Sequence, residues 1–152
     1  MTENAKPGLN ILLVEDDSDD ILFFREALQK LEIRNEVSVA RDCEELFSHF
    51  ENDSSFDVIF LDINLPLMDG KQCLKQIKTS EKYKDVPIIM FTGSSQPGDV
   101  EETYEYGAHY HVVKPYAHSN YVASLEIVFS RNWKEKQPRP SKENYVVNLT
   151  FN

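Results

Sequence analysis

Short apolar runs alternate with helix-forming stretches along most of this chain, and this alternation restricts the possible folds more than any other feature. Runs of this length without polar interruption are typical of strands that are buried on both faces of a parallel sheet. The predicted strands are Leu9–Val14, 57–61, 86–91 and Tyr110–Val113, with 37–40 as a weaker fifth.

Between these runs, apolar residues recur at spacings of three and four, which is the pattern of a helix with one buried face. The pattern is clear in 21–31, 43–50 and 122–133, and weaker around 74–77 and 100–106. Five strand–helix units predict an α/β domain over residues 8–133. We expect a flavodoxin-like (βα)5 three-layer sandwich with a parallel sheet of order 2-1-3-4-5.

The segment after Trp133 has a different character and forms a predicted C-terminal extension, 134–152. Residues 134–142 are polar and include two prolines, so they are expected to be extended. In 145–151, apolar residues alternate as in a strand, with Tyr145, Val147, Leu149 and Phe151 on one face. Two interpretations stay open: a partly ordered tail, or a strand that docks on its own chain or on a second chain.

The charge balance excludes several classes of partner. The 152 residues include 16 Lys and Arg against 26 Asp and Glu, a formal net charge of −10. This argues against binding to nucleic acid or to an anionic membrane surface. There is no apolar run of membrane-spanning length and no secretory signal, so we expect a cytoplasmic protein. Cys43 and Cys73 form no disulfide framework or CxxC motif, and we expect both to be core residues.

Carboxylates follow two strands that the predicted sheet order makes neighbours. Glu15 and Asp16 follow the first strand, and Asp62 follows the third. In an open α/β sheet, ligands bind at the carboxyl ends of the strands, where these side chains are expected to converge. Converging carboxylates repel one another unless a cation lies between them, and hard oxygen ligands suit Mg²⁺.

Two further strands end with groups that can bind phosphate. Thr92 ends the fourth strand with a hydroxyl, and Lys114 follows the fifth with a cation. Together with a metal-binding acidic cluster, they predict a site that receives a phosphoryl group. Asp62 is the expected nucleophile, since aspartyl phosphates are a known covalent intermediate.

Four motifs resemble the CheY-like receiver domains of two-component response regulators. They are LLVEDD (12–17), LDINLPLMDG (61–70), Thr92-Gly93-Ser94 and VVKP (112–115). The resemblance covers about residues 8–133, and their common order and spacing make it specific. It implies Asp62 as the phosphoacceptor. It also implies Mg²⁺ held by Glu15, Asp16, Asp62 and the backbone carbonyl of Asn64.

The resemblance also assigns the switch residues. It implies that Thr92 is the switch hydroxyl, that Lys114 pairs with the phosphate, and that a cis bond precedes Pro115. The family's switch aromatic falls on His111, which is a departure from the pattern. Tyr110 is not expected to replace it, because neighbouring side chains on a strand point to opposite faces.

The resulting functional hypothesis is a stand-alone phosphorylation switch, not an enzyme. A sensor histidine kinase or a histidine phosphotransfer protein is the expected donor, and a downstream protein is the expected target. The sequence is more loosely similar to small regulators that partner phytochrome-type histidine kinases. That similarity implies a homodimer through the face of the fourth helix, fifth strand and fifth helix.

Three alternatives compete with this hypothesis. A flavin-binding flavodoxin needs a phosphate-binding loop after the first strand, where this chain has EDDSDD. A haloacid-dehalogenase-type phosphatase needs its nucleophile after the first strand and a large cap. A receiver that serves only as an unphosphorylated binding module is disfavoured because the active-site positions match the family's pattern.

Overall fold

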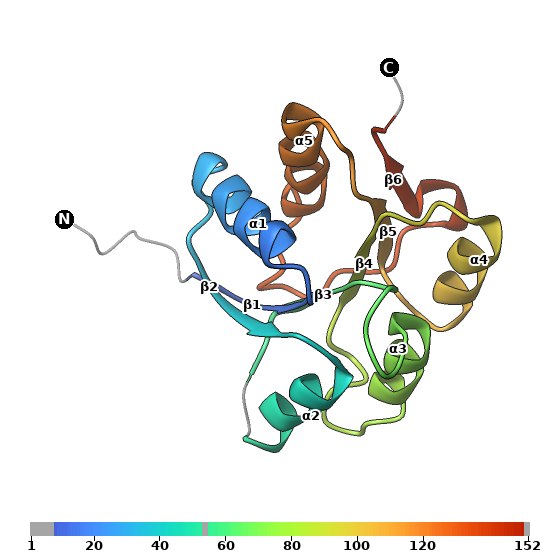
Figure 1. Cartoon of the computed structure of the whole chain (residues 1–152). Helices are drawn as coiled ribbons and strands as arrows, with labels where there is room; N and C mark the ends of the chain where they lie inside the picture. The colour runs from blue at the N-terminus through green and yellow to red at the C-terminus, as the bar shows by residue number, and fades with distance from the viewer. Residues whose placement is uncertain (1–7, 53–54, 151–152) are drawn as a thin grey trace.

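The structure is a computed structural model that describes residues 8–52 and 55–150. In this part of the chain, a six-stranded parallel sheet has the order β2-β1-β3-β4-β5-β6 (Figure 1). The predicted order of the first five strands is confirmed. The strands are β1 (Leu9–Val14), β2 (Asn35–Ala40), β3 (Val58–Leu61), β4 (Ile88–Thr92), β5 (Tyr110–Val113) and β6 (Val146–Asn148).

Helices cover both faces of the sheet and divide the core in two. One apolar cluster lies beneath α1 (Ser18–Lys30) and α5 (His118–Phe129). The other lies beneath α2 (Cys43–Glu51), α3 (Gly70–Lys78) and α4 (Pro97–Glu105) (Figure 1). None of the helices in 8–52 and 55–150 is long and apolar enough to cross a membrane.

The last helix is shorter than its apolar pattern predicts. That pattern extends to Trp133, but α5 ends at Phe129. Trp133 is nevertheless buried, because the chain turns back and its Nε1 donates to the carbonyl oxygen of Val128 at 2.9 Å. Its ring meets those of His109 and Tyr110 edge to face. The helix-like spacing up to Trp133 therefore reflects burial on the same side of the sheet as α5, and not a continuous helix.

The C-terminal extension contributes a strand to the sheet. After a short 3-10 helix, η1 (Lys142–Asn144), β6 runs parallel to β5 with Val147 opposite Val112. The strand interpretation is therefore confirmed, although Phe151 lies outside the described residues. The prediction that Tyr145 and Val147 share a face is wrong. Tyr145 still has helical φ and ψ angles (−72° and −39°) and packs on the α4 side, whereas Val147 packs on the α5 side.

The two cysteines are buried, as predicted, but they are also bonded to each other. Cys43 at the start of α2 and Cys73 in α3 form a disulfide with a Cα–Cα distance of 5.9 Å. The expectation that they take no part in a disulfide is therefore wrong. The two cysteines are 30 positions apart with no local signal of pairing, and only the packing of α2 and α3 on the same face brings them together.

Candidate functional site

The carboxyl ends of β1 and β3 place two acids side by side, as predicted. Val14, the last residue of β1, lies opposite Leu61, the last residue of β3. The next residues are Glu15 and Asp62, and the backbone N–H of Asp62 donates to the carbonyl oxygen of Val14 at 3.2 Å. Both acids are almost completely buried, with 2% and 6% of their surface exposed. Such burial of carboxylates requires a compensating cation.

Lys114 provides that cation. It follows β5, and its ammonium contacts the carboxylates of Glu15, of Asp62 at 3.3 Å and of Asp20 at 3.0 Å. Only 11% of the lysine side chain is exposed. The sequence predicted that Glu15, Asp62 and Lys114 share a site. It did not place Asp20 at this site.

The charges of this cluster shift the pKa values of its members. Burial raises the pKa of Glu15 to about 7, and the charge of Lys114 opposes this increase. Burial by itself lowers the pKa of Lys114, but the charges of Asp62, Glu15 and Asp20 more than compensate and raise it. The lysine is therefore a fixed positive charge, whereas protonation of Glu15 depends on what else binds in the site.

Asp16 and Asn64 lie beside this cluster and do not join it. The Asp16 side chain is exposed, and its carbonyl oxygen accepts a hydrogen bond from Arg41 Nη1 at 3.1 Å. Asn64 lies in the loop after β3, where its backbone N–H donates to Asp62 Oδ1 at 3.2 Å. This bond orients the Asp62 carboxylate.

Thr92 and Pro115 occupy the expected edge of the sheet. Thr92 is fully buried, and its hydroxyl accepts the backbone N–H of Ser94 at 3.4 Å. Within the described residues, no hydrogen bond joins this hydroxyl to Asp62 or Lys114. The prediction of a cis bond before Pro115 is wrong: the described chain contains no cis peptide bond. The trans form is the intrinsically favoured one for X–Pro, and Lys114 reaches its partners from it.

His111 faces α4 from β5 and is fully buried. Its Nε2 lies 2.8 Å from the carbonyl oxygen of Ser94, and its Nδ1 lies 3.4 Å from Thr103 Oγ1. Burial lowers its pKa, so the ring is neutral. The adjacent Tyr110 packs on the opposite face, where its hydroxyl accepts from Arg131 Nε at 2.5 Å. Tyr110 therefore does not take the place of His111, as predicted.

A glycine allows α3 to approach the backbone of Asp62 closely. Gly70 begins α3, and its N–H donates to the carbonyl oxygen of Ile63 at 2.8 Å. A Cβ at this position would lie only 2.0 Å from the carbonyl oxygen of Asp62. In the sequence, Gly70 is only the last residue of the LDINLPLMDG motif. The structure shows that a side chain here would displace the backbone that carries Asp62.

The donor set of this site fits a hard cation. Carboxylate oxygens of Glu15 and Asp62 converge on the Lys114 ammonium, and carboxylates are the ligands that Mg²⁺ prefers. Among the described residues, however, no three His, Cys, Asp or Glu side chains are arranged as a metal site. The three carboxylates that contact Lys114 are therefore not arranged as metal ligands in the present structure, and a full ligand set needs contributions from the adjacent loops.

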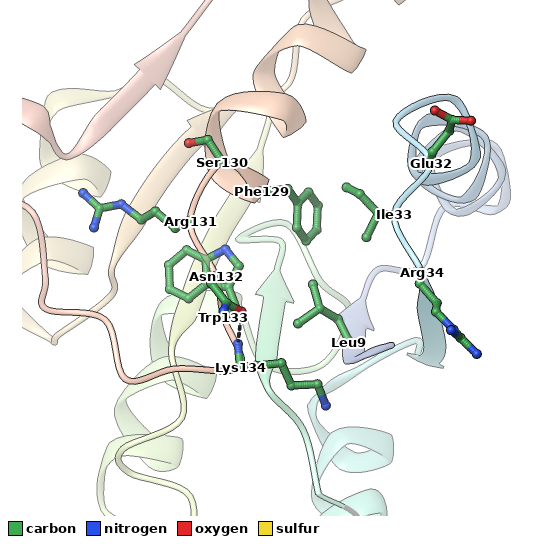
Figure 2. A pocket seen from close by; sticks show the side chains of 10 residues that line it. All are labelled: Leu9, Glu32, Ile33, Arg34, Phe129, Ser130, Arg131, Asn132, Trp133 and Lys134. Atoms are coloured by element: carbon green, nitrogen blue, oxygen red, sulfur yellow. Dashed lines mark hydrogen bonds between the residues drawn. The ribbon is translucent and has the colours of Figure 1, made fainter. Parts of the chain in front are cut away.

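A cavity lies elsewhere in the described part of the molecule. It has a volume of about 780 Å³ and lies between the start of β1 and the end of α5, with Leu9, Ile33, Phe129 and Trp133 around it (Figure 2). None of the acids that contact Lys114 lines this cavity. The candidate site is thus a charged edge of the sheet that is separate from this cavity.

The fold and this site together define a CheY-like domain. A family model described as "Response regulator receiver domain" matches residues 11–126. The chain therefore belongs to the response regulator receiver domain family of two-component signalling. Members of this family typically act as phosphoacceptors and not as enzymes.

Three comparisons give the closeness of this relationship. The chain is 32% identical over 111 residues to Response regulator Rcp1 of Synechocystis sp., covering 69% of this chain and 76% of that protein. The phosphorylated cyanobacterial phytochrome response regulator RcpA superposes with a TM-score of 0.77 at 28% identity, covering 89% of this chain and 100% of the other. The Mn²⁺-bound form of Rcp1 superposes with a TM-score of 0.75 at 28% identity, covering 88% and 99%.

Proposed function

We propose that this receiver accepts a phosphoryl group on Asp62 from a histidine kinase or a histidine phosphotransfer protein, in a phosphorelay. The observation that carries the proposal is the contact of Lys114 with Asp62 and Glu15 at the carboxyl edge of the sheet. An aspartate carboxylate is the nucleophile in reactions that form an aspartyl phosphate. The Lys114 ammonium can then balance the charge of the phosphoryl group.

In the proposed transfer, a carboxylate oxygen of Asp62 attacks the phosphorus of the donor's phosphohistidine. A P–O bond to Asp62 forms as the P–N bond to the imidazole breaks. The imidazole keeps the electron pair of that bond and takes up a proton from solvent. The products are an acyl phosphate on Asp62 and a neutral histidine on the donor.

Glu15, Asp16, Asp62 and the carbonyl of Asn64 are the groups that would hold Mg²⁺. When bound, the metal neutralises charge on the phosphoryl oxygens. The structure of the relative Rcp1 contains Mn²⁺, and that of RcpA is phosphorylated, which supports both parts of the proposal. In this chain, Lys114 and Thr92 are the groups that would contact the phosphoryl oxygens from β5 and β4.

Exposed apolar side chains near the site support a protein as the donor. Leu22 and Phe23 follow Asp20 on α1, with 52% and 41% of their surface exposed. Leu67 and Tyr116, in the loops after β3 and β5, are 86% and 101% exposed. Apolar groups around a polar centre are typical of protein docking surfaces.

A homodimer through the face of α4, β5 and α5 remains part of the proposal, as does a downstream protein that binds this face. Because β6 covers the outer edge of β5, the contact surface is formed by α4, β6 and α5. Ile127 on α5 and Val146 on β6 are 43% and 40% exposed, which supports an apolar contact. Light scattering of the wild type and of Ile127→Lys tests it: a monomeric mass for both proteins, with and without phosphodonor, rejects the dimer.

Incubation with Mg²⁺ and acetyl phosphate, followed by intact mass spectrometry, tests the phosphoacceptor assignment. Acetyl phosphate transfers the same group with acetate as the leaving group. We expect the wild type to gain one phosphoryl group and Asp62→Asn to gain none. Asp19→Asn is the matched control, because Asp19 is an exposed carboxylate on the same edge and should leave the gain intact. If the wild type gains no phosphoryl group, the phosphoacceptor assignment is wrong and the protein is a binding module.

A further inference from the structure

Three buried polar side chains connect the C-terminal strand to the loop that follows Thr92. Tyr145, Thr103 and His111 are each 0% exposed. The Tyr145 hydroxyl donates to Thr103 Oγ1 at 2.6 Å, and Thr103 Oγ1 lies 3.4 Å from His111 Nδ1. His111 Nε2 in turn lies 2.8 Å from the carbonyl oxygen of Ser94. A buried network of this kind holds its members in one arrangement, because an unpaired member is costly.

The direction of each hydrogen bond follows from the chemistry of the groups. A carbonyl oxygen can only accept, so the proton of the neutral His111 ring lies on Nε2 and is donated to Ser94. Nδ1 then has a lone pair that faces the Thr103 hydroxyl. The Thr103 oxygen accepts from Tyr145, and its single proton is shared between His111 Nδ1 and the carbonyl oxygen of Val100, which lies 3.2 Å away. Thr103 is therefore the member that joins Tyr145 to His111.

Ser94 is the residue through which this network reaches the candidate site. Its backbone N–H donates to the Thr92 hydroxyl at 3.4 Å. Its own hydroxyl donates to Asp99 Oδ2 at 2.6 Å, and Asp99 is paired with Lys71 at 2.8 Å. Ser94 is thus held by His111 at its carbonyl group and by Asp99 at its side chain. The position of Ser94 therefore determines whether its N–H can bond to the Thr92 hydroxyl.

We infer that Tyr145 is a positioning residue for the phosphorylation site, acting through Thr103, His111 and Ser94 on the orientation of the Thr92 hydroxyl. This inference rests on the proposed function, because it concerns how readily Asp62 accepts and keeps a phosphoryl group. It gives the C-terminal extension a regulatory role: the segment that forms β6 stabilises the unphosphorylated arrangement of the loop after β4. Loosening this segment favours phosphorylation.

The variant Tyr145→Phe isolates the role of one hydroxyl. It keeps the buried ring and the backbone bond from His111 N–H to the carbonyl oxygen of Tyr145, which is 3.0 Å long. Tyr104→Phe is the matched control, because the Tyr104 ring packs edge to face on Tyr145 while its hydroxyl makes no hydrogen bond within the described residues. Thr103→Val, which interrupts the network at its middle, provides a second test if Tyr145→Phe folds poorly.

Two measurements on the full chain test the inference. The first is the phosphorylation rate at several acetyl phosphate concentrations with Mg²⁺, followed by the decay of the phosphorylated protein. The second is the exchange rate of the His111 Nε2 proton by NMR in unphosphorylated protein. In Tyr145→Phe we expect the maximal phosphorylation rate to rise about fivefold, the equivalent of one neutral hydrogen bond, with the half-saturating donor concentration unchanged. The phosphorylated form should decay more slowly, and the Nε2 proton should exchange faster.

The inference is overturned if Tyr145→Phe and Thr103→Val both keep the phosphorylation rate, the decay rate and the Nε2 proton exchange rate of the wild type. An equal change in Tyr104→Phe would also overturn it, since the effect would then not depend on the network. If the wild type takes no phosphoryl group, the proposed function fails. The Nε2 exchange would still decide whether Tyr145 positions His111, so the two failures are distinguishable.

Discussion

The Lys114 ammonium lies 3.3 Å from the Asp62 carboxylate, although 52 residues separate them in sequence. The strands β3, β4 and β5 are neighbours and run parallel, so their carboxyl ends lie at the same edge of the sheet. Asp62 follows β3 and Lys114 follows β5, which brings the two side chains together. Lys114 is also the cation that allows Glu15 to be buried. Its role in the unphosphorylated protein is therefore structural as well as chemical.

Lys114→Ala should lower the free energy of unfolding by about 3 kcal/mol in the absence of divalent metal, the usual cost of leaving a buried charge unpaired. Added Mg²⁺ should stabilise the variant more than the wild type, because the ammonium no longer competes for the same carboxylates. Urea denaturation with EDTA or Mg²⁺ measures both effects. Lys142→Ala, which breaks an exposed pair with Glu101, should leave stability almost unchanged. Equal responses of wild type and Lys114→Ala to Mg²⁺ would contradict the prediction.

Gly70→Ala should lower the free energy of unfolding by about 3 kcal/mol and slow phosphorylation of Asp62, because the new Cβ would overlap the Asp62 carbonyl oxygen. Gly98→Ala is the control: a Cβ there meets nothing within 4 Å, so stability should stay the same or rise by up to about 1 kcal/mol. Thermal denaturation and intact mass spectrometry give the two readouts. Two variants of equal stability would show that the close approach of α3 is unimportant.

Two buried groups should make stability depend on pH in opposite directions. Burial lowers the pKa of His109 from 6.5 to about 4, so its contribution is present above pH 6.5 and is lost as the pH falls toward 4. Burial raises the pKa of Glu15 from 4.5 to about 7, so its contribution is present below pH 4.5 and is lost as the pH rises through 7. In the wild type these effects offset each other over the shared range.

Glu15→Gln should therefore lose stability more steeply than the wild type when the pH falls from 6.5 to 4.5. His109→Gln should instead gain stability over the same range. The histidine contribution is about 3 kcal/mol at most. Urea denaturation in metal-free buffer at several pH values measures both slopes. Parallel slopes for the two variants would show that neither group titrates differently in the folded and unfolded states.

Reduction of the Cys43–Cys73 disulfide should lower the free energy of unfolding by about 3 kcal/mol, because the unfolded chain regains the freedom of a loop closed across 30 residues. Cys73→Ala should show a comparable loss and no response to dithiothreitol. Denaturation with and without reductant is the measurement. Free thiols at both positions in protein purified without reductant would contradict the pairing.

Deletion of residues 142–152 should lower the melting temperature markedly, since it removes the fully buried Tyr145 and uncovers the edge of β5. An uncovered strand edge also pairs with other chains, so the mass by light scattering should rise. Tyr145→Phe should keep both the mass and most of the stability. A truncated chain with unchanged melting temperature and mass would mean that β6 contributes nothing to the fold.

Strand bounds were predicted well where the apolar pattern is strong and poorly where it is weak or interrupted. The bounds of β1 and β5 match the predicted runs, because both strands lie in the interior of the sheet and are mostly apolar. β2 begins at Asn35, two residues before the weak run, because its exposed first residues have no apolar pattern. The predicted alternation of Tyr145 with Val147 failed since periodicity does not show where a helical turn ends and a strand begins.

The sequence by itself determined the class of fold, the order of the strands and the placement of Glu15, Asp62, Thr92 and Lys114 at one edge of the sheet. Strand-end positions are local properties, and in a parallel sheet local position decides which edge a residue occupies. Only the tertiary structure brought Asp20 to Lys114, Cys43 to Cys73, and Tyr145 through Thr103 to His111. These contacts depend on how helices and the C-terminal strand pack against one another, and this packing produces no periodic pattern in the sequence.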